Sequence, residues 1–496
     1  MEPLLQAFLE LLKDPFVLLT ILLASAYGLF VGAIPGFTAT MAVALLVPFT
    51  FLLDTKLSIA GIVALTATAI FSGDIPGALI RIPGTPASAA YTADAYELTR
   101  KGRGAWVLGI SLVASVAGGL FGAAALIVAA PALAKIAFYF TTYEYFWLVV
   151  LGLSSAVVVT GANPAKAIVS LLLGLCLSLI GLDEVNGAPR MTFGFDELGG
   201  GISFIPAMIG LFGLAEVLRG ISRSLTAVAF EPQRREAILI PACRLVAQRF
   251  GAFLRSSGIG TLIGILPGAG ADIAAWVSYG VSRRLSKNRE EYGRGSWEGV
   301  SDASAANNAA LGGAWIPALV FGIPGDSVTA IVIGILLMKG ITPSAKIFTN
   351  EVTSKIVASI YVSFIVANIL LIPLGYIAIR LGGWMVKVPR RILLPIIFLF
   401  CLVGSFSMNA SFFDVGVMLV MGILGFFLEA RGFSVGPIVL GLVLGPMLEQ
   451  NFRFSFIKCG GNLTEFVARP IAGILAFCVL ALWVGPYLKA RIFRRS

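Results

Sequence analysis

The chain has 496 residues, of which 58% are hydrophobic and only 12% are charged. Because a soluble domain carries about 25% charged residues, this composition excludes a solvated globule and indicates a protein embedded in a lipid bilayer. The formal net charge is +10. The chain contains no histidine, and this excludes Ser-His-Asp and Cys-His catalysis and every histidine-ligated metal centre.

The first predicted element is a pair of apolar arms, residues 15–54, broken by Pro35-Gly36. The residues before it carry no basic region, so we expect a mature N-terminus rather than a cleaved signal peptide. A Pro-Gly break inside the membrane frees backbone groups that protein, water or a ligand must then bond. The second arm opens a new helix whose free N–H groups favour an anion, with Thr38 and Thr40 in its first turn. The alternative is a simple kink with threonine caps.

A second broken segment, residues 72–88, follows. It contains three prolines within eleven residues, Pro76, Pro83 and Pro86, which together forbid a regular helix. We expect its unwound carbonyls, together with nearby hydroxyl oxygens, to bind Na⁺.

Two charged residues of this segment, Asp74 and Arg81, are expected inside the membrane. A charge there costs at least about 2.5–3.5 kcal/mol, so each should be paired or functional. Either the two side chains pair with each other, or Arg81 binds a substrate carboxylate. Residues 91–101 come next and are predicted to form a polar interfacial helix with aromatic anchors.

Basic residues gather in short loops, which is the positive-inside pattern of a membrane protein. The clusters are Arg219 to Arg235, Arg283 to Arg289, Lys387 to Arg391 and Lys489 to Arg495. Because this charge lies between apolar segments, it indicates topology rather than polyanion binding, and we expect no nucleic-acid partner.

The second half of the chain contains a second pair of arms, residues 250–283, around Pro267-Gly268. Here Gly270 and Asp272 open the new helix. Further on, Asn307-Asn308 lead into a segment broken at Pro324-Gly325 and followed by Asp326, Ser327 and Thr329. Buried amides are costly unless hydrogen-bonded. They are predicted to coordinate a cation or substrate, with a helix cap or a bond between helices as the alternative.

These elements form a weak internal repeat. Gly28, Gly32 and Pro35-Gly36 recur as Gly260, Gly264 and Pro267-Gly268 at an offset of 232, and Pro76 with Pro83-Gly84 recurs as Pro317 with Pro324-Gly325 at an offset of 241. Lys101-Gly102 matches Lys339-Gly340, and Pro206 matches Pro437. The repeat predicts two membrane halves, 15–220 and 250–453, a connecting cytoplasmic segment, 221–249, and a terminal transmembrane helix, 467–486.

The predicted fold class is therefore an all-α polytopic membrane protein with about 11–12 transmembrane helices. Basic residues flank the second pair of arms, whereas the first pair is flanked by acidic and basic residues whose charges cancel. Because basic ends are expected on the cytoplasmic side, the two pairs of arms should enter from opposite faces of the membrane, which favours two inverted repeats. Each arm has about 16–19 residues, a marginal length for a full span, so spanning and re-entrant hairpins both stay open.

The motifs GAIPGFTATMAVAL, GDIPGALIRIPGTPASAA, GILPGAGADIAAWVSYG and ANNAALGGAWIPALVFGIPGDSVTAIVIG resemble the large membrane subunit of the tripartite tricarboxylate transporters, over nearly the whole chain. The resemblance implies a permease of the bacterial inner membrane that works with a small membrane subunit and a periplasmic solute-binding protein. It implies uptake of citrate-like tricarboxylates or dicarboxylates driven by an ion gradient, with Na⁺ or H⁺ as the coupling ion, no organic cofactor and no enzymatic activity. A homo-oligomer stays open.

The chain departs from the family at a few positions. Arg81 stands where the family often has asparagine, Asp94-Ala95-Tyr96 where it usually has Asp-Gly-Tyr, and Asp302-Ala303-Ser304 where Ala-Pro-Glu is common. An additional cation at position 81 favours a more highly charged anion or pairs with Asp74. These departures concern the substrate rather than the class of protein.

Two other functions compete with transport. One is an intramembrane aspartyl protease that uses Asp74 and Asp272; the other is a scaffold subunit whose Pro-Gly breaks are purely structural. For transport, the predicted substrate-binding residues are Pro35, Gly36, Thr38, Thr40, Arg81, Gly84, Thr85, Pro267, Gly268, Gly270, Asn307, Asn308, Pro324 and Gly325. The predicted cation-binding residues are Ser72, Asp74, Thr85, Ser88, Asp272, Asp326, Ser327 and Thr329.

Overall fold

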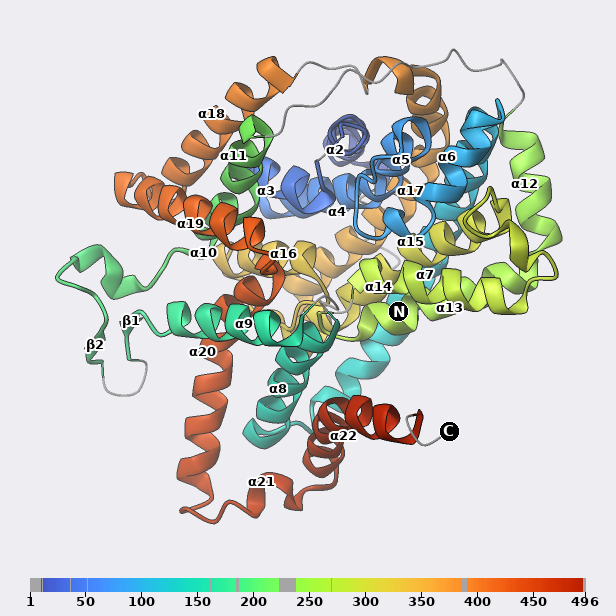
Figure 1. Ribbon diagram of the computed structural model, residues 1–496. Helices are drawn as coiled ribbons and strands as arrows, with labels where there is room; N and C mark the ends of the chain where they lie inside the picture. Colours follow the sequence, from blue (N-terminus) through green and yellow to red (C-terminus); the bar gives the residue numbers. More distant parts are fainter. Residues whose placement is uncertain are drawn as a thin grey trace.

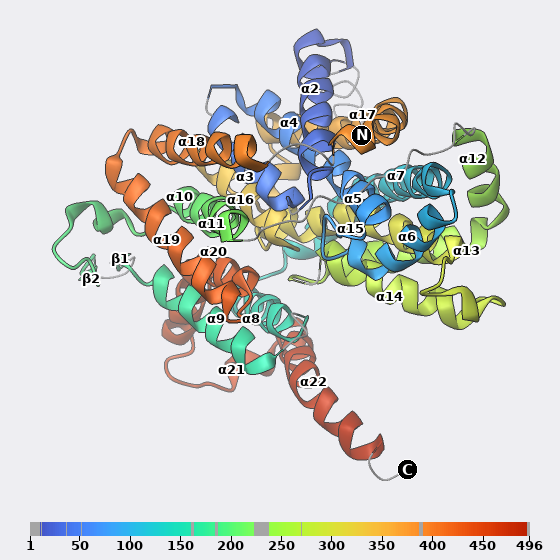
Figure 2. The ribbon, with the colours of Figure 1, turned by 45° about the horizontal axis from the view of Figure 1, so that its top comes forward.

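The computed structural model describes residues 10, 12–35, 37–50, 52–159, 163–183, 187–222, 238–268, 270–385 and 390–493. Gly36 and most of the predicted connecting segment lie outside the described residues. Within them the chain is almost entirely helical (Figures 1 and 2), and one antiparallel strand pair, β1 (Gly181–Leu182) and β2 (Pro189–Arg190), is present. The predicted all-α membrane architecture is confirmed.

The helices succeed one another along both halves of the chain. They are α2 (Pro15–Gly32), α3 (Ala39–Thr50), α4 (Thr55–Ser72), α5 (Asp74–Ile80), η1 (Ser88–Ala90), α6 (Thr92–Arg100), α7 (Gly104–Ala137), α8 (Thr142–Val159), α9 (Pro164–Ser178), η2 (Asp196–Gly200), α10 (Phe204–Met208), the π-helix η3 (Ile209–Leu214), α11 (Ala215–Ser222), α12 (Leu239–Gln248), α13 (Phe250–Ile265), α14 (Gly270–Leu285), η4 (Arg289–Glu291), α15 (Trp297–Phe321), α16 (Ser327–Met338), η5 (Ala345–Phe348), α17 (Glu351–Met385), α18 (Arg390–Asn409), α19 (Phe412–Ala430), α20 (Val435–Lys458), α21 (Glu465–Ala468) and α22 (Pro470–Phe493).

Seven helices of the described chain are long and apolar enough to cross a membrane. They are Pro15–Gly32, Thr55–Ile80, Gly104–Ala137, Phe204–Ser222, Val352–Met385, Phe412–Ala430 and Val435–Lys458. The described chain also has shorter apolar helices of 10–17 residues, among them Ala39–Thr50, which follows the first Pro-Gly break, and Ser327–Met338, which follows Pro324-Gly325. The chain is thus a multi-pass membrane protein, while the total of 11–12 spans and the inverted orientation stay predictions.

Equivalent glycines in the two halves allow equivalent helix crossings. A Cβ atom on Gly28 or Gly32 of α2 would lie within 3.0 Å of backbone carbonyls of α4, and one on Gly260 or Gly264 of α13 within 3.0 Å of carbonyls of α15. Small residues let membrane helices approach closely enough for backbones to touch. The sequence repeat therefore corresponds to a repeat of helix packing.

The broken segments also end in the same way in both halves. Thr85 and Ser88 bond each other's backbone N–H groups with their side-chain oxygens, and Asp326 and Thr329 form the same reciprocal capping box. After α6 and α16, Gly102 and Gly340 adopt φ values of 77° and 75°, as expected for helix-ending Lys-Gly elements. Long helices, α7 and α17, follow in each half.

The helices α8, α9, α20 and α22 lie outside the two pairs of crossing helices described above (Figure 1). In Figure 1, α8, α20 and α22 lie below α13 and α14, whereas α9 runs at about the same height as α13. The helix α22 lies far from α2 in both views (Figures 1 and 2). A helix, α22, lies at the position of the predicted terminal transmembrane helix and begins at Pro470 after the short α21; that it spans the membrane stays a prediction.

Candidate functional site

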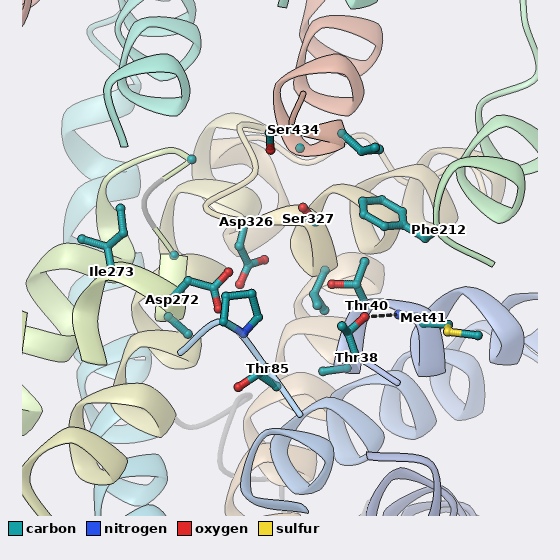
Figure 3. A pocket seen from close by; sticks show the side chains of 18 of the residues that line it. Thr38, Thr40, Met41, Thr85, Phe212, Asp272, Ile273, Asp326, Ser327 and Ser434 are labelled. Atoms are coloured by element: carbon teal, nitrogen blue, oxygen red, sulfur yellow. Dashed lines mark hydrogen bonds between the residues drawn. The ribbon is translucent and has the colours of Figure 1, made fainter. Parts of the chain in front are cut away.

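A cavity of about 520 Å³ lies where four broken segments of the chain meet. Thr38 and Thr40 line it from the start of α3, and Thr85 and Pro86 from the turn before η1. In the second half, Gly268 and residues 270–273 line it from the start of α14, and Asp326 to Val328 from the start of α16. Figure 3 shows these tips facing one space. Each half thus contributes one hairpin tip and one broken segment to the cavity.

Two of these tips present the N-terminal ends of helices. At the start of α3 the Thr38 hydroxyl accepts a hydrogen bond from the Met41 N–H at 3.3 Å. At the start of α14, Gly268 and Gly270 have φ values of 77° and 53°, a conformation that favours glycine. Side chains at these positions would also collide with Ala156 and Asp326. The free N–H groups of a helix start carry partial positive charge, which favours an anion.

The opposite electrostatic feature of the cavity is its four acidic residues, of which Asp272 and Asp326 lie on the tips and Glu216 and Glu429 on α11 and α19. Asp272 Oδ1 accepts a hydrogen bond from the Ala87 N–H at 3.2 Å, and Asp326 Oδ1 accepts one from the Thr329 N–H at 2.8 Å. The two carboxylates repel each other electrostatically, and Figure 3 shows them on neighbouring tips beside Ser327. No group of three or more acidic or cysteine side chains suited to a metal is found among the described residues.

Arg219 is a cavity residue that the sequence analysis assigned to a basic loop. Because α10, η3 and α11 continue one another as far as Ser222, Arg219 lies on a helix, and it is one of the residues that line the cavity. It forms ion pairs with Glu216 and with Glu429 of α19. Among the described residues that line the cavity, it alone carries a positive charge. The i, i+3 spacing of Glu216 and Arg219 in an apolar stretch was the available signal.

The lining includes further residues that the sequence analysis did not select. Phe212 lies on η3, and Trp276 of α14 donates its indole N–H to the Pro86 carbonyl at 3.3 Å. Ser434 to Pro437 bring the start of α20 to the cavity. The predicted residue Asn307 lines it from the middle of α15.

Arg81 and Asp74 lie away from the cavity. Arg81 is exposed at the end of α5 with a φ of 59°, and its guanidinium lies over the Tyr96 ring at 5.9 Å. Asp74 is buried and accepts hydrogen bonds from the Tyr91 hydroxyl at 2.6 Å and from the Ser111 hydroxyl. Within the described residues the two form no ion pair, and neither lines the cavity.

The other predicted residues occupy positions behind the lining. The Ser72 hydroxyl bonds the Gly28 carbonyl at 3.1 Å across the α2–α4 crossing, and Asn308 donates to the Ser115 carbonyl at 2.9 Å. Ser88 and Thr329 are used in the two capping interactions described above. Pro35, Gly84, Pro267, Pro324 and Gly325 lie in the turns that carry the lining residues but are not part of the lining, and Gly36 lies outside the described residues.

Comparison with known proteins agrees with the resemblance drawn from the motifs. Residues 18–440 match the Tripartite tricarboxylate transporter TctA family. A relative from Agrobacterium vitis, the "Uncharacterized 52.8 kDa protein in TAR-I ttuC' 3'region", is 35% identical over 460 residues, which cover 92% of this chain and 90% of that protein. A second, the "Uncharacterized protein in TAR-II ttuC' 3'region" of the same organism, is 40% identical over 216 residues, which cover 44% of this chain and 88% of that protein. No solved structure matches the chain. The match spans both halves and every tip of the cavity, and the chain belongs to the TctA family of tripartite tricarboxylate transporters.

Proposed function

We propose that this chain takes up small carboxylate anions, citrate-like tricarboxylates or dicarboxylates, across the bacterial inner membrane. Uptake is driven by an ion gradient of Na⁺ or H⁺. A periplasmic solute-binding protein delivers the substrate, and a small membrane subunit completes the permease. Membership of the TctA family supports the tripartite arrangement.

The observation that carries the proposal is that two helix starts and Arg219 share one cavity, whose acidic residues Glu216 and Glu429 pair with that arginine. The starts of α3 and α14 and Arg219 all line it, and each favours a carboxylate. The cavity volume of about 520 Å³ lies within the about 300–1,000 Å³ typical of small-molecule sites. In this proposal a substrate carboxylate replaces Glu429 as a partner of Arg219.

The coupling cation, where it is Na⁺, binds on the acidic side of the same cavity. Asp272 and Asp326 supply carboxylate oxygens, and Thr85 and Ser327 lie beside them on the lining. Hard cations such as Na⁺ favour oxygen ligands of this kind. A cation between the two carboxylates relieves their mutual repulsion and lowers the cost of bringing an anion into the cavity.

Alternating access follows from the origin of the four tips. Two come from each half of the chain, so a rigid movement of one half against the other opens or closes the cavity to one side of the membrane. The ion pair between Arg219 of the first half and Glu429 of the second crosses that division and is expected to break during the cycle.

The competing functions receive no comparable support. An aspartyl protease requires two aspartates that flank one water molecule. Asp272 lines the cavity, whereas Asp74 is buried against Tyr91 and Ser111 and does not line it. A pure scaffold has no need of an anion-favouring cavity.

The proposal is tested by transport in proteoliposomes that contain both membrane subunits, with the solute-binding protein outside. Labelled citrate and succinate are the probes. We expect accumulation that requires both the binding protein and an imposed Na⁺ or pH gradient. Uptake that needs neither, or no movement of either probe, contradicts the proposal.

A further inference from the structure

Asp74 is a buried carboxyl group without a cationic partner among the described residues. It opens α5 inside the apolar segment Thr55–Ile80, and only 4% of its surface is exposed. Its two side-chain partners are the Tyr91 hydroxyl, at 2.6 Å, and the Ser111 hydroxyl. Both groups are neutral. A charged carboxylate in such a place is costly, and membrane proteins retain one chiefly for function.

The chemistry of these partners suits a carboxyl group that gains and loses a proton. A hydroxyl group can either donate or accept a hydrogen bond. Tyr91 and Ser111 therefore donate to the charged carboxylate, and one of them turns to accept when the carboxyl group is protonated. No ion pair has to break in this exchange.

The hydrogen bonds continue from Asp74 to the cavity. The Asn307 amide donates to the Tyr91 hydroxyl at 3.5 Å, and Asn307 lines the cavity. On the other branch, the Ser111 and Ser304 hydroxyls lie 3.0 Å apart. Ser304 and Asn307 are three residues apart on α15 and so share one face of that helix. The protonation state of Asp74 is thus linked to the helix that carries a cavity residue.

The second half shows that the fold does not require an acid at this position. At the offset of 241 that aligns Pro76 with Pro317, Asp74 corresponds to Trp315. Trp315 is fully buried and packs edge-on against the Phe364 ring, with centroids 5.5 Å apart. The equivalent proline-containing segment is therefore built without a carboxyl group or its hydroxyl partners.

We propose that Asp74 binds the coupling proton of transport, with Tyr91 as its link to the cavity. This inference rests on the proposed function and specifies its driving ion. A water molecule that enters from the cavity beside Asn307 gives a proton to the Tyr91 hydroxyl, which passes its own hydrogen to Asp74 and keeps the arriving one. Protonated Asp74 then donates to a hydroxyl partner, which changes the hydrogen bonding available to Asn307. Release of the proton on the opposite side reverses these steps.

The experiment compares Asp74→Asn with the wild type in proteoliposomes that contain both membrane subunits and the binding protein. Net uptake of labelled succinate and citrate under an imposed pH gradient is measured together with internal pH, reported by a trapped dye. Exchange of labelled for unlabelled substrate is measured without a gradient. Asp414→Asn is the matched control, because Asp414 is also buried in an apolar helix, is bonded by Asn409 at 2.7 Å and lies outside the cavity.

We expect the wild type to move protons inward with its substrate. Asp74→Asn should lose gradient-driven net uptake and proton movement while it retains exchange, since exchange requires no net proton transfer. Asp414→Asn should behave as the wild type. At neutral and higher pH both carboxyl groups of succinate are ionised. There the affinity of the wild type for succinate should fall by up to about tenfold for each unit rise in pH, as one linked proton requires. Asp74→Asn should lose that dependence.

Several results would overturn the inference. These are wild-type uptake without proton movement, proton-coupled uptake by Asp74→Asn, or loss of both uptake and exchange in a folded Asp74→Asn protein. If Asp74→Asn does not fold, the wild-type proton measurement and the Tyr91→Phe variant decide, since Tyr91→Phe should slow proton-driven uptake more than exchange. A wild type that neither exchanges nor accumulates either probe contradicts the proposed function instead, so the two failures are distinguishable.

Discussion

Replacement of Arg219 by glutamine tests the anion site most directly. A hydrogen bond between charged groups contributes about 1.5–3 kcal/mol. Because the Arg219 side chain is only 26% exposed, solvent screens it weakly. Since about 1.4 kcal/mol is a factor of ten, Arg219→Gln should raise the Kd for a carboxylate by about 10–150-fold. Glu216 and Glu429, left without their cation, add repulsion in the same direction.

The assay is ligand-induced stabilisation of the purified protein by citrate, succinate and acetate. At a concentration of about 100 Kd a ligand stabilises the folded state by about 2.7 kcal/mol. If Kd rises about 50-fold, the same concentration stabilises it by only about 0.6 kcal/mol. Arg453→Gln is the control, because Arg453 also pairs with two acids, Asp183 and Glu449, away from the cavity.

Arg453→Gln should lower the stability of the free protein and leave the ligand-induced increase unchanged. The reasoning is refuted if Arg219→Gln keeps the full ligand-induced stabilisation, or if both variants lose it equally. Arg219→Lys, which retains the charge but not the bidentate geometry, should fall between the wild type and Arg219→Gln.

Three further substitutions separate packing, capping and charge. Gly264→Val should lower the free energy of unfolding by at least about 1–3 kcal/mol and reduce the folded fraction in detergent, because the new side chain meets the Ala310 backbone. The control is Gly258→Val on the same helix, which should fold because a Cβ atom there meets nothing within 4 Å. Asp326→Ala should lower stability by about 1 kcal/mol through loss of the cap, whereas Asp326→Asn should keep the cap. Where Na⁺ stabilises the wild type, Asp326→Asn should lose that stabilisation; an Asp326→Asn protein that Na⁺ stabilises as much as the wild type contradicts the cation site. Arg81→Asn should leave substrate affinity unchanged, because Arg81 is exposed and asparagine tolerates its left-handed backbone; a loss comparable to that of Arg219→Gln places Arg81 back in the site.

The sequence by itself determined the class of protein and the positions of its breaks. Composition alone requires a bilayer, and a Pro-Gly pair favours a break in a membrane helix, as it does at Pro35, Pro267 and Pro324, although Pro76-Gly77 lies within α5. Both are local properties, so Pro35, Pro267 and the segments around Pro83 and Pro324 were identified without a structure. The internal repeat could also be recognised in the sequence, because equivalent helix crossings require glycines at equivalent positions.

Tertiary structure alone decided which side chains share the cavity. Arg219 reads as one of several loop charges, but the continuous helix from Phe204 to Ser222 carries it to the lining. Arg81 reads as a membrane cation, yet it is exposed over Tyr96. Asp74 obtains its partners from Tyr91 and from Ser111 on a later helix. Side-chain direction and contacts between distant segments depend on how helices cross, and periodicity along one chain carries no information about that crossing.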